Sequence, residues 1–428
     1  MTVPSPRAFL RSLFDAAVAA ADPRRILPPV LATIPRPAPG RTLVVGAGKA
    51  AAAMAVAVED AWGDKPGGRI EGLVVTRYGH GLPTRSIEVV EAGHPNPDEA
   101  GEASARRMLA MAEGLGEDDL LLALVSGGGS ALLTCPLPGL ALADLKALTR
   151  ALLACGASIH EINCVRKHLC ALFGGRLAAA AHPARVVGLA ISDVPGDNPS
   201  VIASGPTVPD ESTLADARAV LAKYAIAPAS SIARHLADPA NETPKLGDPR
   251  LARAETRVVV TPQAALEAAA RASAEAGVPA FVLGDRIEGE AREVGIAMAG
   301  IAKGIGRGAH SLPRPCAVIS GGETTVTVRG KGRGGRNVEF LLALAVALDG
   351  QAGIHAIACD TDGIDGTEDN AGAILGPDSL ARAAAQGLDP KAALADNDAY
   401  ALFAGLGDLV VTGPTRTNVN DFRVVLAT

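Results

Sequence analysis

Short apolar runs alternate with alanine- and leucine-rich helical stretches along this chain, and glycine-rich or acidic turns close several of the runs. In the first half the runs are Thr42–Val45, Gly72–Thr76, Ile87–Val90, Leu120–Val125 and Val186–Ile191. Helical patterns near 49–60, 98–113, 142–154, 159–170 and 213–223 lie between or beyond them. A strand that is apolar along its whole length is buried on both faces, and its alternation with helices is typical of a parallel sheet. The pattern therefore predicts an α/β fold.

The same alternation starts again after the polar, proline-containing segment 238–249. Its strands are Arg257–Val260, Ala280–Leu283, Cys316–Ser320, Thr324–Val328 and Ile354–Cys359, with helices near 262–276, 288–305 and 335–348. A chain of 428 residues also exceeds what one hydrophobic core usually organises. We therefore expect two α/β domains, residues 1–245 and 246–428.

Composition narrows the choice of partners. The net charge of −6 gives no basic excess for a nucleic acid, and aromatic residues make up only 3% of the chain. Six cysteines without a C-x-x-C pair indicate reduced, mostly buried thiols and no zinc site. Ser5 and Pro6 resemble a helix start, and no apolar stretch is long enough to cross a membrane. These features predict a soluble, cytoplasmic protein without a membrane partner.

Three glycine-rich turns resemble anion sites. Glycine-rich loops that open a helix present backbone N–H groups to an anion, and nearby cations add to the attraction. One turn follows the first strand and contains Lys49, another follows Leu120–Val125, and the last holds Arg336 with two further cations. The predicted phosphate- or substrate-binding residues are Gly46, Gly48, Ser126, Gly127, Gly128, Gly129, Ser130, Gly334, Gly335 and Asn337.

The first turn also matches the relaxed dinucleotide fingerprint G-x-G-x-x-A, which makes a Rossmann-like domain the expected form of the parallel sheet. The next strand ends in Thr76-Arg77 and lacks the acidic residue that would hold the ribose of NAD. Arg77 could accept a 2′-phosphate, so NADP stays open. The Walker-type P-loop and the G-x-S-x-G nucleophile elbow are both absent from the sequence.

Carboxylates also follow strands in this chain. Asp193 and Asp197 suit a base and a magnesium ligand, because Mg²⁺ prefers oxygen ligands and a base must accept a substrate proton. The segment from Asp360 to Gly366 has the spacing of a calcium loop but no glutamate at the twelfth position, so a Mg²⁺–phosphate or loop-ordering role is favoured. The tentative magnesium ligands are Asp197, Glu323, Asp360 and Asp362.

Eight motifs, taken together in their order, resemble the class II glycerate kinases, in which a glycerate-kinase N-terminal region precedes a MOFRL domain. The motifs are GAGKAA, SGGGSALL, SDVPGD, IASGPT, SGGETTV, GRGGRNVEF, DTDGIDG and TGPTRTNVND. The resemblance covers nearly the whole chain and implies a MOFRL region at about 314–425. One departure is Val338, where the family usually has glutamine, so a side-chain role at that position is in doubt.

The resemblance implies phosphorylation of D-glycerate by ATP and Mg²⁺, generally at the 2-hydroxyl, in an interdomain cleft. Lys49 and Arg336 match the family's catalytic cations, and Asp193 matches its strand-end aspartate. Many members carry the older name hydroxypyruvate reductase, so an NAD(P)H-dependent reductase is the alternative, and a non-catalytic sensor is a third. A homodimer is a further expectation. Which glycine loop holds ATP and which holds glycerate stays open.

Overall fold

The computed structural model describes residues 5–63, 66–309 and 311–428. The chain forms two compact units. One spans Pro23–Val259, and the other joins the N-terminal residues up to Asp22 with Val260–Thr428. We call them the parallel-sheet unit and the mixed-sheet unit. This division differs from the predicted boundary at residue 245, and it also moves the N-terminal helix into the unit formed by the C-terminal half.

The physical reason for the shifted boundary lies in the segment expected to be a linker. It forms two short 3₁₀ turns, Pro239–Asn241 and Pro249–Leu251, and Thr243 is buried. The Thr243 hydroxyl donates a 3.0 Å hydrogen bond to Asp210. A proline-rich stretch with such anchors is part of a packed unit. The strand expected to open the second sheet, β6 (Ala254–Val260), lies instead at the edge of the first sheet.

The parallel-sheet unit contains a six-stranded sheet in the order β3-β2-β1-β4-β5-β6. Its other strands are β1 (Thr42–Ala47), β2 (Ile70–Arg77), β3 (Ile87–Ala92), β4 (Leu120–Val125) and β5 (Arg185–Ile191). β1 pairs in parallel with both β2 and β4, and the pairs β2–β3 and β4–β5 are also parallel. This is the strand order of dinucleotide-binding folds, in which the direction of winding reverses between β1 and β4. The predicted Rossmann-like sheet is confirmed.

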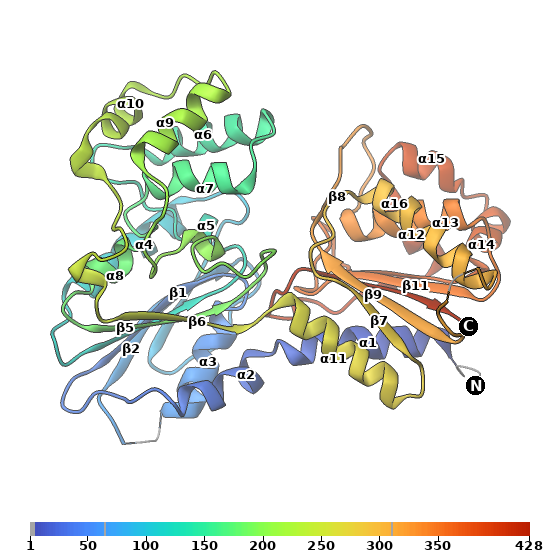
Figure 1. Ribbon diagram of the computed structural model, residues 1–428, viewed down its shortest axis with the longest axis horizontal. Coiled ribbons are helices and arrows are strands. Elements are labelled where there is room, and N and C mark those ends of the chain that lie inside the picture. The colour runs from blue at the N-terminus through green and yellow to red at the C-terminus, as the bar shows by residue number, and fades with distance from the viewer. Residues whose placement is uncertain (1–4, 64–65, 310) are drawn as a thin grey trace. The chain divides into compact units, whose positions relative to one another are not determined.

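Helices cover both faces of this sheet (Figure 1). On one side lie α2 (Pro23–Leu31) and α3 (Ala51–Trp62), and on the other lie α4 (Glu99–Glu113), α5 (Gly129–Leu132) and α8 (Arg176–Ala180). A separate helical cluster packs around leucines and isoleucines such as Leu148, Leu152 and Ile162. It consists of α6 (Leu142–Ala154), α7 (Ile159–Lys167), α9 (Leu214–Lys223) and α10 (Ser230–Ala237). The 3₁₀ turn η1 (Ile202–Ser204) contacts α5.

The mixed-sheet unit has its own six-stranded sheet, in the order β13-β12-β11-β14-β9-β7. The strands are β7 (Ala280–Gly284), β9 (Cys316–Gly322), β11 (Ile354–Asp360), β12 (Gly372–Leu375), β13 (Leu409–Val410) and β14 (Asp421–Ala427). β14 runs antiparallel to β9 and β11, whereas β7 and β9 are parallel. The predicted strand Thr324–Val328 shrinks to β10 (Thr324–Thr325), which pairs with β8 (Gly289–Glu290).

Helices also cover both faces of the mixed sheet (Figure 1). One face carries α1 (Pro6–Ala20) and α11 (Pro262–Glu275). The other carries α12 (Ala291–Gly306), α13 (Arg336–Leu348), α14 (Ser379–Ala385), α15 (Pro390–Ala395) and α16 (Ala399–Leu406). α12 and α13 pack on each other and, with β9 and β11, form the main core of the unit.

The N-terminal helix α1 begins as its sequence predicts. Ser5 is the N-cap, its hydroxyl accepts the N–H of Ala8 at 3.4 Å, and Pro6 occupies the first turn. The helix buries Leu10, Leu13, Phe14 and Ala17 against α11, β11 and β14. Phe14 lies 5.9 Å from Phe422 of β14 between ring centroids. The apolar stripe of α1 therefore completes the mixed-sheet unit.

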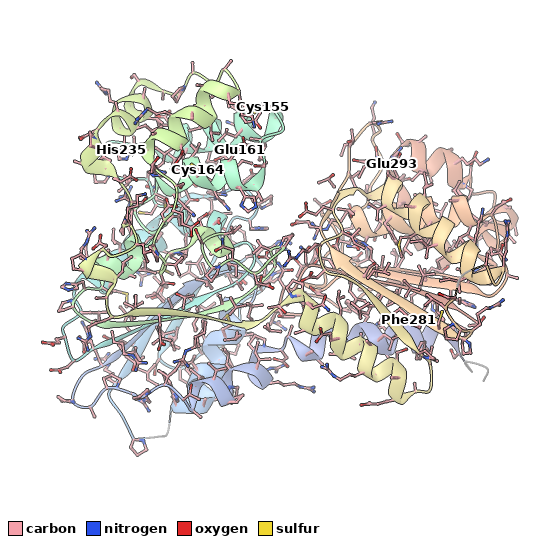
Figure 2. All side chains as sticks on the ribbon, viewed as in Figure 1. Cys155, Glu161, Cys164, His235, Phe281 and Glu293 are labelled. Atoms are coloured by element: carbon pink, nitrogen blue, oxygen red, sulfur yellow. The ribbon has the colours of Figure 1, made fainter. Side chains whose placement is uncertain are left out.

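All six cysteines are free, as predicted, and five of them are buried. The exposed one is Cys155, which follows α6, and Figure 2 shows it and the buried Cys164 of α7 in the helical cluster. Among the residues that the structure describes, no helix is both long and apolar enough to span a bilayer.

Replacing Phe14 by alanine should destabilise the mixed-sheet unit by about 3–5 kcal/mol, because it removes a buried aromatic side chain. Hydrogen exchange should then rise in β11, β14 and α11 and stay unchanged in β1–β5. Asp15→Ala, on the exposed face of the same helix, is the matched control. Faster exchange in the parallel sheet instead would place α1 in the other unit.

Candidate active site

Three predicted turns of the parallel-sheet unit meet at one edge of its sheet. Lys49 follows β1, the Ser126–Ser130 turn follows β4, and Asp193 follows β5. These strands are neighbours and parallel, so their carboxyl ends share an edge. Ligands of open α/β sheets bind at this edge, where the winding direction reverses. In this unit the reversal falls between β1 and β4.

The turns after β1 and β4 are hydrogen-bonded to each other. The N–H of Lys49 donates to the carbonyl of Gly127 at 2.9 Å, and the N–H of Ala50 donates to the buried Ser126 hydroxyl at 3.0 Å. Gly48 has a φ of +136°, and a Cβ there would lie 2.1 Å from the Ser126 hydroxyl oxygen. The Ser126 side chain thus joins two turns, whereas Lys49 is half-buried at their junction. Gly46, predicted with this turn, lies within β1.

The main chain of the β4 turn has the form of an anion nest. Gly128 has a φ of +81°, and the N–H groups of Gly127 and Gly128 donate no hydrogen bond to any residue that the structure describes. Consecutive N–H groups around a left-handed residue converge on one point and favour an anion there. The predicted role of this turn therefore rests on its main chain.

The Ser130 hydroxyl is held by residues that the sequence analysis did not select. It lies 2.8 Å from the Ser204 hydroxyl, which in turn donates to Asn163 at 3.2 Å. Ser204 and its neighbour Ala203 have positive φ values of +61° and +48°. A left-handed conformation in two successive non-glycine residues is strained, and such strain concentrates at functional sites. Both residues belong to the motif IASGPT, which the sequence analysis noted for its resemblance to the family. The motif contains no side chain with an evident catalytic role, so its residues were not selected.

The turn after β5 holds two half-buried carboxylates, Asp193 and Asp197. Asp197 adopts a φ of +56°, and its N–H donates to the Val194 carbonyl at 3.2 Å, which closes a tight turn. Its Oδ1 atom is buried and accepts no hydrogen bond from the described residues. A buried carboxylate oxygen in this state suits a cation or a donor hydroxyl.

In the mixed-sheet unit, Arg336 is the first residue of α13 and the centre of an ion-pair cluster. Its guanidinium donates to Asp421 at 2.7 Å, to Glu323 and Asp360 at 2.9 Å each, and to Asn420 at 3.3 Å. These four bonds leave one of the five guanidinium N–H groups for a ligand. Burial would lower the pKa of Arg336, but the carboxylates of Asp421, Asp360 and Glu323 raise it well above its ordinary value.

Asp421, the first residue of β14, is buried and binds two arginines. Its second oxygen accepts from Arg423, which is also buried and lies over the ring of Phe340. Asn337 donates to Asp421 at 2.9 Å and to Asp365 at 3.3 Å. Burial raises the pKa of Asp421, but Arg336 and Arg423 lower it below its ordinary value. Asn337, predicted to bind a ligand, is completely buried and positions these carboxylates instead.

The N-terminus of α13 is occupied by the protein's own carboxylate. Asp365 accepts the N–H of Asn337 at 3.0 Å and that of Val338 at 2.9 Å. A Cβ on Gly335 would lie 2.3 Å from the Asp365 Oδ1 atom, so glycine is needed for this approach. The predicted phosphate cradle formed by these main-chain N–H groups is therefore not present, and Gly334 and Gly335 shape the loop. The bond from Val338 uses its main chain, so the departure from glutamine leaves it intact.

The predicted magnesium ligands are divided between the units. Glu323 and Asp360 lie together beside Arg336, and Asp360 is buried while Glu323 is exposed. Asp362 is buried, accepts the N–H of Ile364 at 2.8 Å, and orders its own loop. Within the described ranges no three His, Cys, Asp or Glu side chains gather as a metal site. Mg²⁺ in kinases is commonly held by one or two carboxylates and substrate phosphates, and Glu323 with Asp360 fits that pattern.

Comparisons with known proteins identify the family of this chain. Residues 9–237 match the family described as Domain of unknown function (DUF4147), and residues 316–421 match the MOFRL family. The chain is 54% identical to an Agrobacterium vitis protein provisionally named hydroxypyruvate reductase, over 99% of this chain and 94% of the relative. It is 43% identical to the D-glycerate 2-kinase of Thermotoga maritima over 92% of each chain.

A solved structure gives the same result. The crystal structure of glycerate kinase from Thermotoga maritima superposes with a TM-score of 0.86 at 40% identity and covers 99% of both chains. The fold and the two family matches thus define an α/β protein with a DUF4147 region followed by a MOFRL region. The chain belongs to the glycerate kinase family that has this organisation.

Asp365 gives the site a testable pH dependence. Burial raises the pKa of this carboxyl to about 6, because the two N–H bonds only partly offset desolvation. The folded state therefore holds the proton more tightly than the unfolded state, whose pKa is about 3.9. The stability from this group is complete below pH ~4 and is lost as the pH rises through ~6.

Relative to Asp365→Asn, the wild type should lose on the order of 2–3 kcal/mol of unfolding free energy between pH ~4 and ~7. Chemical denaturation of both proteins across that range measures the difference. Asp15→Asn, an exposed carboxylate of α1, is the charge-matched control. A wild-type-to-variant difference that does not change with pH would contradict the assignment.

Proposed function

We propose that this protein transfers the γ-phosphoryl group of ATP to D-glycerate, at the 2-hydroxyl, in the presence of Mg²⁺. The observation that carries the proposal is Arg336, an arginine held by three carboxylates with one donor left for a ligand. Phosphoryl transfer needs positioned positive charge more than covalent chemistry. The names of the Thermotoga maritima relatives support the same reaction.

The predicted catalytic residues then have the following roles. Lys49 and Arg336 stabilise charge on the transferring phosphoryl group, and Asp193 orients the 2-hydroxyl and accepts its proton. The β4 turn binds an anionic group, either the glycerate carboxylate or ATP phosphates. Glu323 and Asp360 would hold Mg²⁺, with Asp197 as a further candidate ligand. When bound, Mg²⁺ supplies neutralisation of phosphate charge.

Reduction of hydroxypyruvate is the second candidate, favoured by the dinucleotide-type strand order and by the name of the Agrobacterium vitis relative. The β1 turn weighs against it. Pyrophosphate in such folds binds the N–H groups at the start of the first helix. In this chain the N–H groups of Lys49 and Ala50 donate to the β4 turn instead.

One pair of assays separates the two reactions. Pure protein is incubated with D-glycerate, ATP and Mg²⁺, and in parallel with hydroxypyruvate and NADH or NADPH. We expect ADP formation that depends on glycerate, and no oxidation of the nicotinamide. Nicotinamide oxidation without ADP formation would overturn the kinase proposal.

Replacing Asp193 by asparagine should lower kcat by roughly 10²-fold or more, because asparagine keeps the shape of the side chain but cannot accept the proton. Asp197→Asn, in the same turn, is the comparison. Measuring the thermal stability together with kcat distinguishes a catalytic from a structural role of Asp193. Near-normal turnover with lower stability in Asp193→Asn would make that residue structural.

Lys49→Ala and Arg336→Ala should each lower kcat by about 10² to 10³, with smaller changes in KM. If both cations act on one phosphoryl group, the double variant should be much less impaired than the product of the single effects. Arg336→Lys should restore activity only in part, because a point charge lacks the planar fork of the guanidinium. Strictly multiplicative losses would mean that the two cations serve separate steps.

We also propose a cytoplasmic location, since six free thiols suit a reducing compartment. We further propose a homodimer. The molar mass of the purified protein in solution, measured by sedimentation, tests it.

A further inference from the structure

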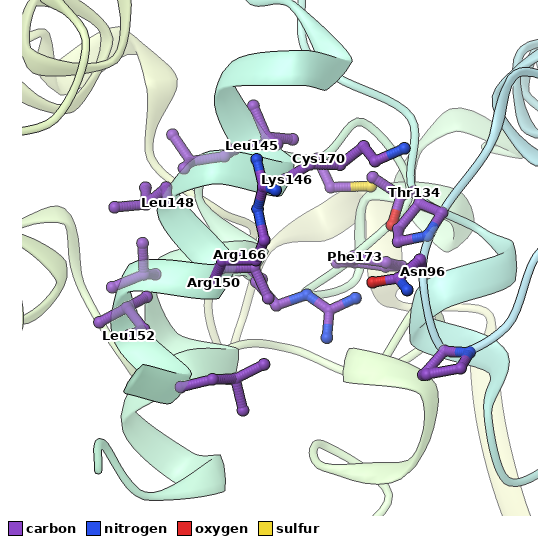
Figure 3. A pocket seen from close by; sticks show the side chains of 16 residues that line it. Asn96, Thr134, Leu145, Lys146, Leu148, Arg150, Leu152, Arg166, Cys170 and Phe173 are labelled. Atoms are coloured by element: carbon purple, nitrogen blue, oxygen red, sulfur yellow. The ribbon is translucent and has the colours of Figure 1, made fainter. Parts of the chain in front are cut away.

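A second anion-binding feature lies in the helical cluster of the parallel-sheet unit. A cavity of about 620 Å³ opens between α6, α7 and the loop that follows β3. Figure 3 shows Lys146, Arg150 and Arg166 among its sixteen lining side chains. The lining contains no aspartate or glutamate. The cavity is therefore positively charged without any neutralising group in its wall.

Arg166 is the most informative of these cations. It is half-buried in the last turn of α7 and lies over the ring of Phe173 at 5.9 Å. No carboxylate or carbonyl among the described residues accepts a hydrogen bond from its guanidinium. Its neighbour Lys167 differs, because it is buried and bonded to Asp210 and Ser200. Burial lowers the pKa of Arg166, as expected for a desolvated cation without a counter-ion.

Lys146 and Arg150 belong to α6 and lie four residues apart, on one face of that helix. Like charges at this spacing repel each other. Neither side chain forms an ion pair with a described residue. An anion that binds in this cavity would meet three cations without an ion-pair partner, and its binding would stabilise the folded protein.

The other wall of the cavity is apolar. It contains Leu145, Leu148, Leu152 and Phe173, together with the polar side chains of Asn96 and Thr134. Glycerate has almost no apolar surface, and a volume of this size fits a ligand of drug-like dimensions. The matching ligand is an anion with a sizeable, weakly polar part, as in a nucleotide.

Two segments connect this cavity to the glycine-rich β4 turn within the same unit. Thr134 follows α5, and its hydroxyl donates to the Ser130 carbonyl at 2.9 Å. Asn96 and Pro95 follow His94, whose imidazole would lie 2.9 Å from a Cβ placed on Gly128. The cavity wall and the predicted anion nest are therefore built from the same two loops.

We propose that this cavity binds the nucleoside part of ATP and ADP, with Arg166 contacting a phosphate. The choice of a nucleotide as ligand rests on the proposed kinase function, whereas the volume and the positive charge of the cavity are independent of it. The assignment implies that the glycine turn after β4 receives the phosphates rather than the carboxylate of glycerate. It thereby chooses between the two alternatives left for that turn.

The test is calorimetric titration of the full-length protein with ADP and, separately, with D-glycerate. Arg166→Met removes the charge but keeps an apolar chain on Phe173, and Thr149→Glu places a carboxylate in the cavity wall. Arg234→Met, an exposed arginine of α10 outside the cavity, is the matched control. We expect the Kd for ADP to rise at least about tenfold in both cavity variants and to stay unchanged in the control.

Unchanged ADP affinity in folded cavity variants would overturn the proposal, and so would a loss confined to D-glycerate. If Arg166→Met does not fold, Thr149→Glu decides alone. If the wild type forms no ADP from glycerate but the cavity variants lose ADP binding, the cavity is a nucleotide site and the proposed kinase function is wrong. If the wild type is an active kinase and the cavity variants bind ADP normally, only the cavity proposal is wrong.

Discussion

The buried carboxylate of Asp421 is the interaction on which the mixed-sheet unit depends. It accepts hydrogen bonds from Arg336, Arg423 and Asn337 where β14 begins beside the end of β9. A buried charge without its partner costs about 3–5 kcal/mol, so each member of such a cluster fixes the others. The position of Arg336 at the start of α13 follows from this cluster. Its guanidinium is fixed by the carboxylates and not by a ligand.

The same unit shows why a glycine-rich loop need not be a phosphate cradle. Such a loop opens α13, but Asp365 from a distant segment already occupies the helix N-terminus. The glycines make room for that carboxylate. In the parallel-sheet unit the outcome differs, because the N–H groups of Gly127 and Gly128 have no acceptor among the described residues. Similar sequences thus give an internally capped helix in one unit and a turn with free N–H groups in the other.

Local patterns predicted most of the fold. Continuous apolar strands and capped helices gave the elements of the first sheet, and Ser5 and Pro6 marked the start of α1. Two features depend on long-range contacts and could not be predicted. Helix α1 buries its stripe in the mixed-sheet unit, and β6 pairs with the first sheet after the expected linker. Strand β14 was missed because its motif, TGPTRTNVND, reads as a loop until Asp421 begins the strand.

In the candidate site, too, the features that depend on long-range contacts could not be predicted. Motifs located Lys49 and Asp193 after strands and Arg336 at the start of a helix, because turn and cap chemistry is local. The partners of these residues could not be read from the sequence, since Asp421 lies 85 positions from Arg336. The unpaired cation Arg166 was also missed, because it sits in an ordinary helical pattern. Which charges lack a counter-ion is a property of the folded chain alone.

Phosphorus NMR of the products from D-glycerate, ATP and Mg²⁺ tests the central claim most directly. Transfer to the 2-hydroxyl places phosphorus next to a single proton on carbon 2, so the new phosphomonoester signal should be a doublet. Transfer to the 3-hydroxyl would give a triplet from the two protons of carbon 3. We predict a dominant doublet that grows as ADP appears. A dominant triplet would contradict the regiochemistry, and the absence of any new phosphomonoester would contradict the kinase.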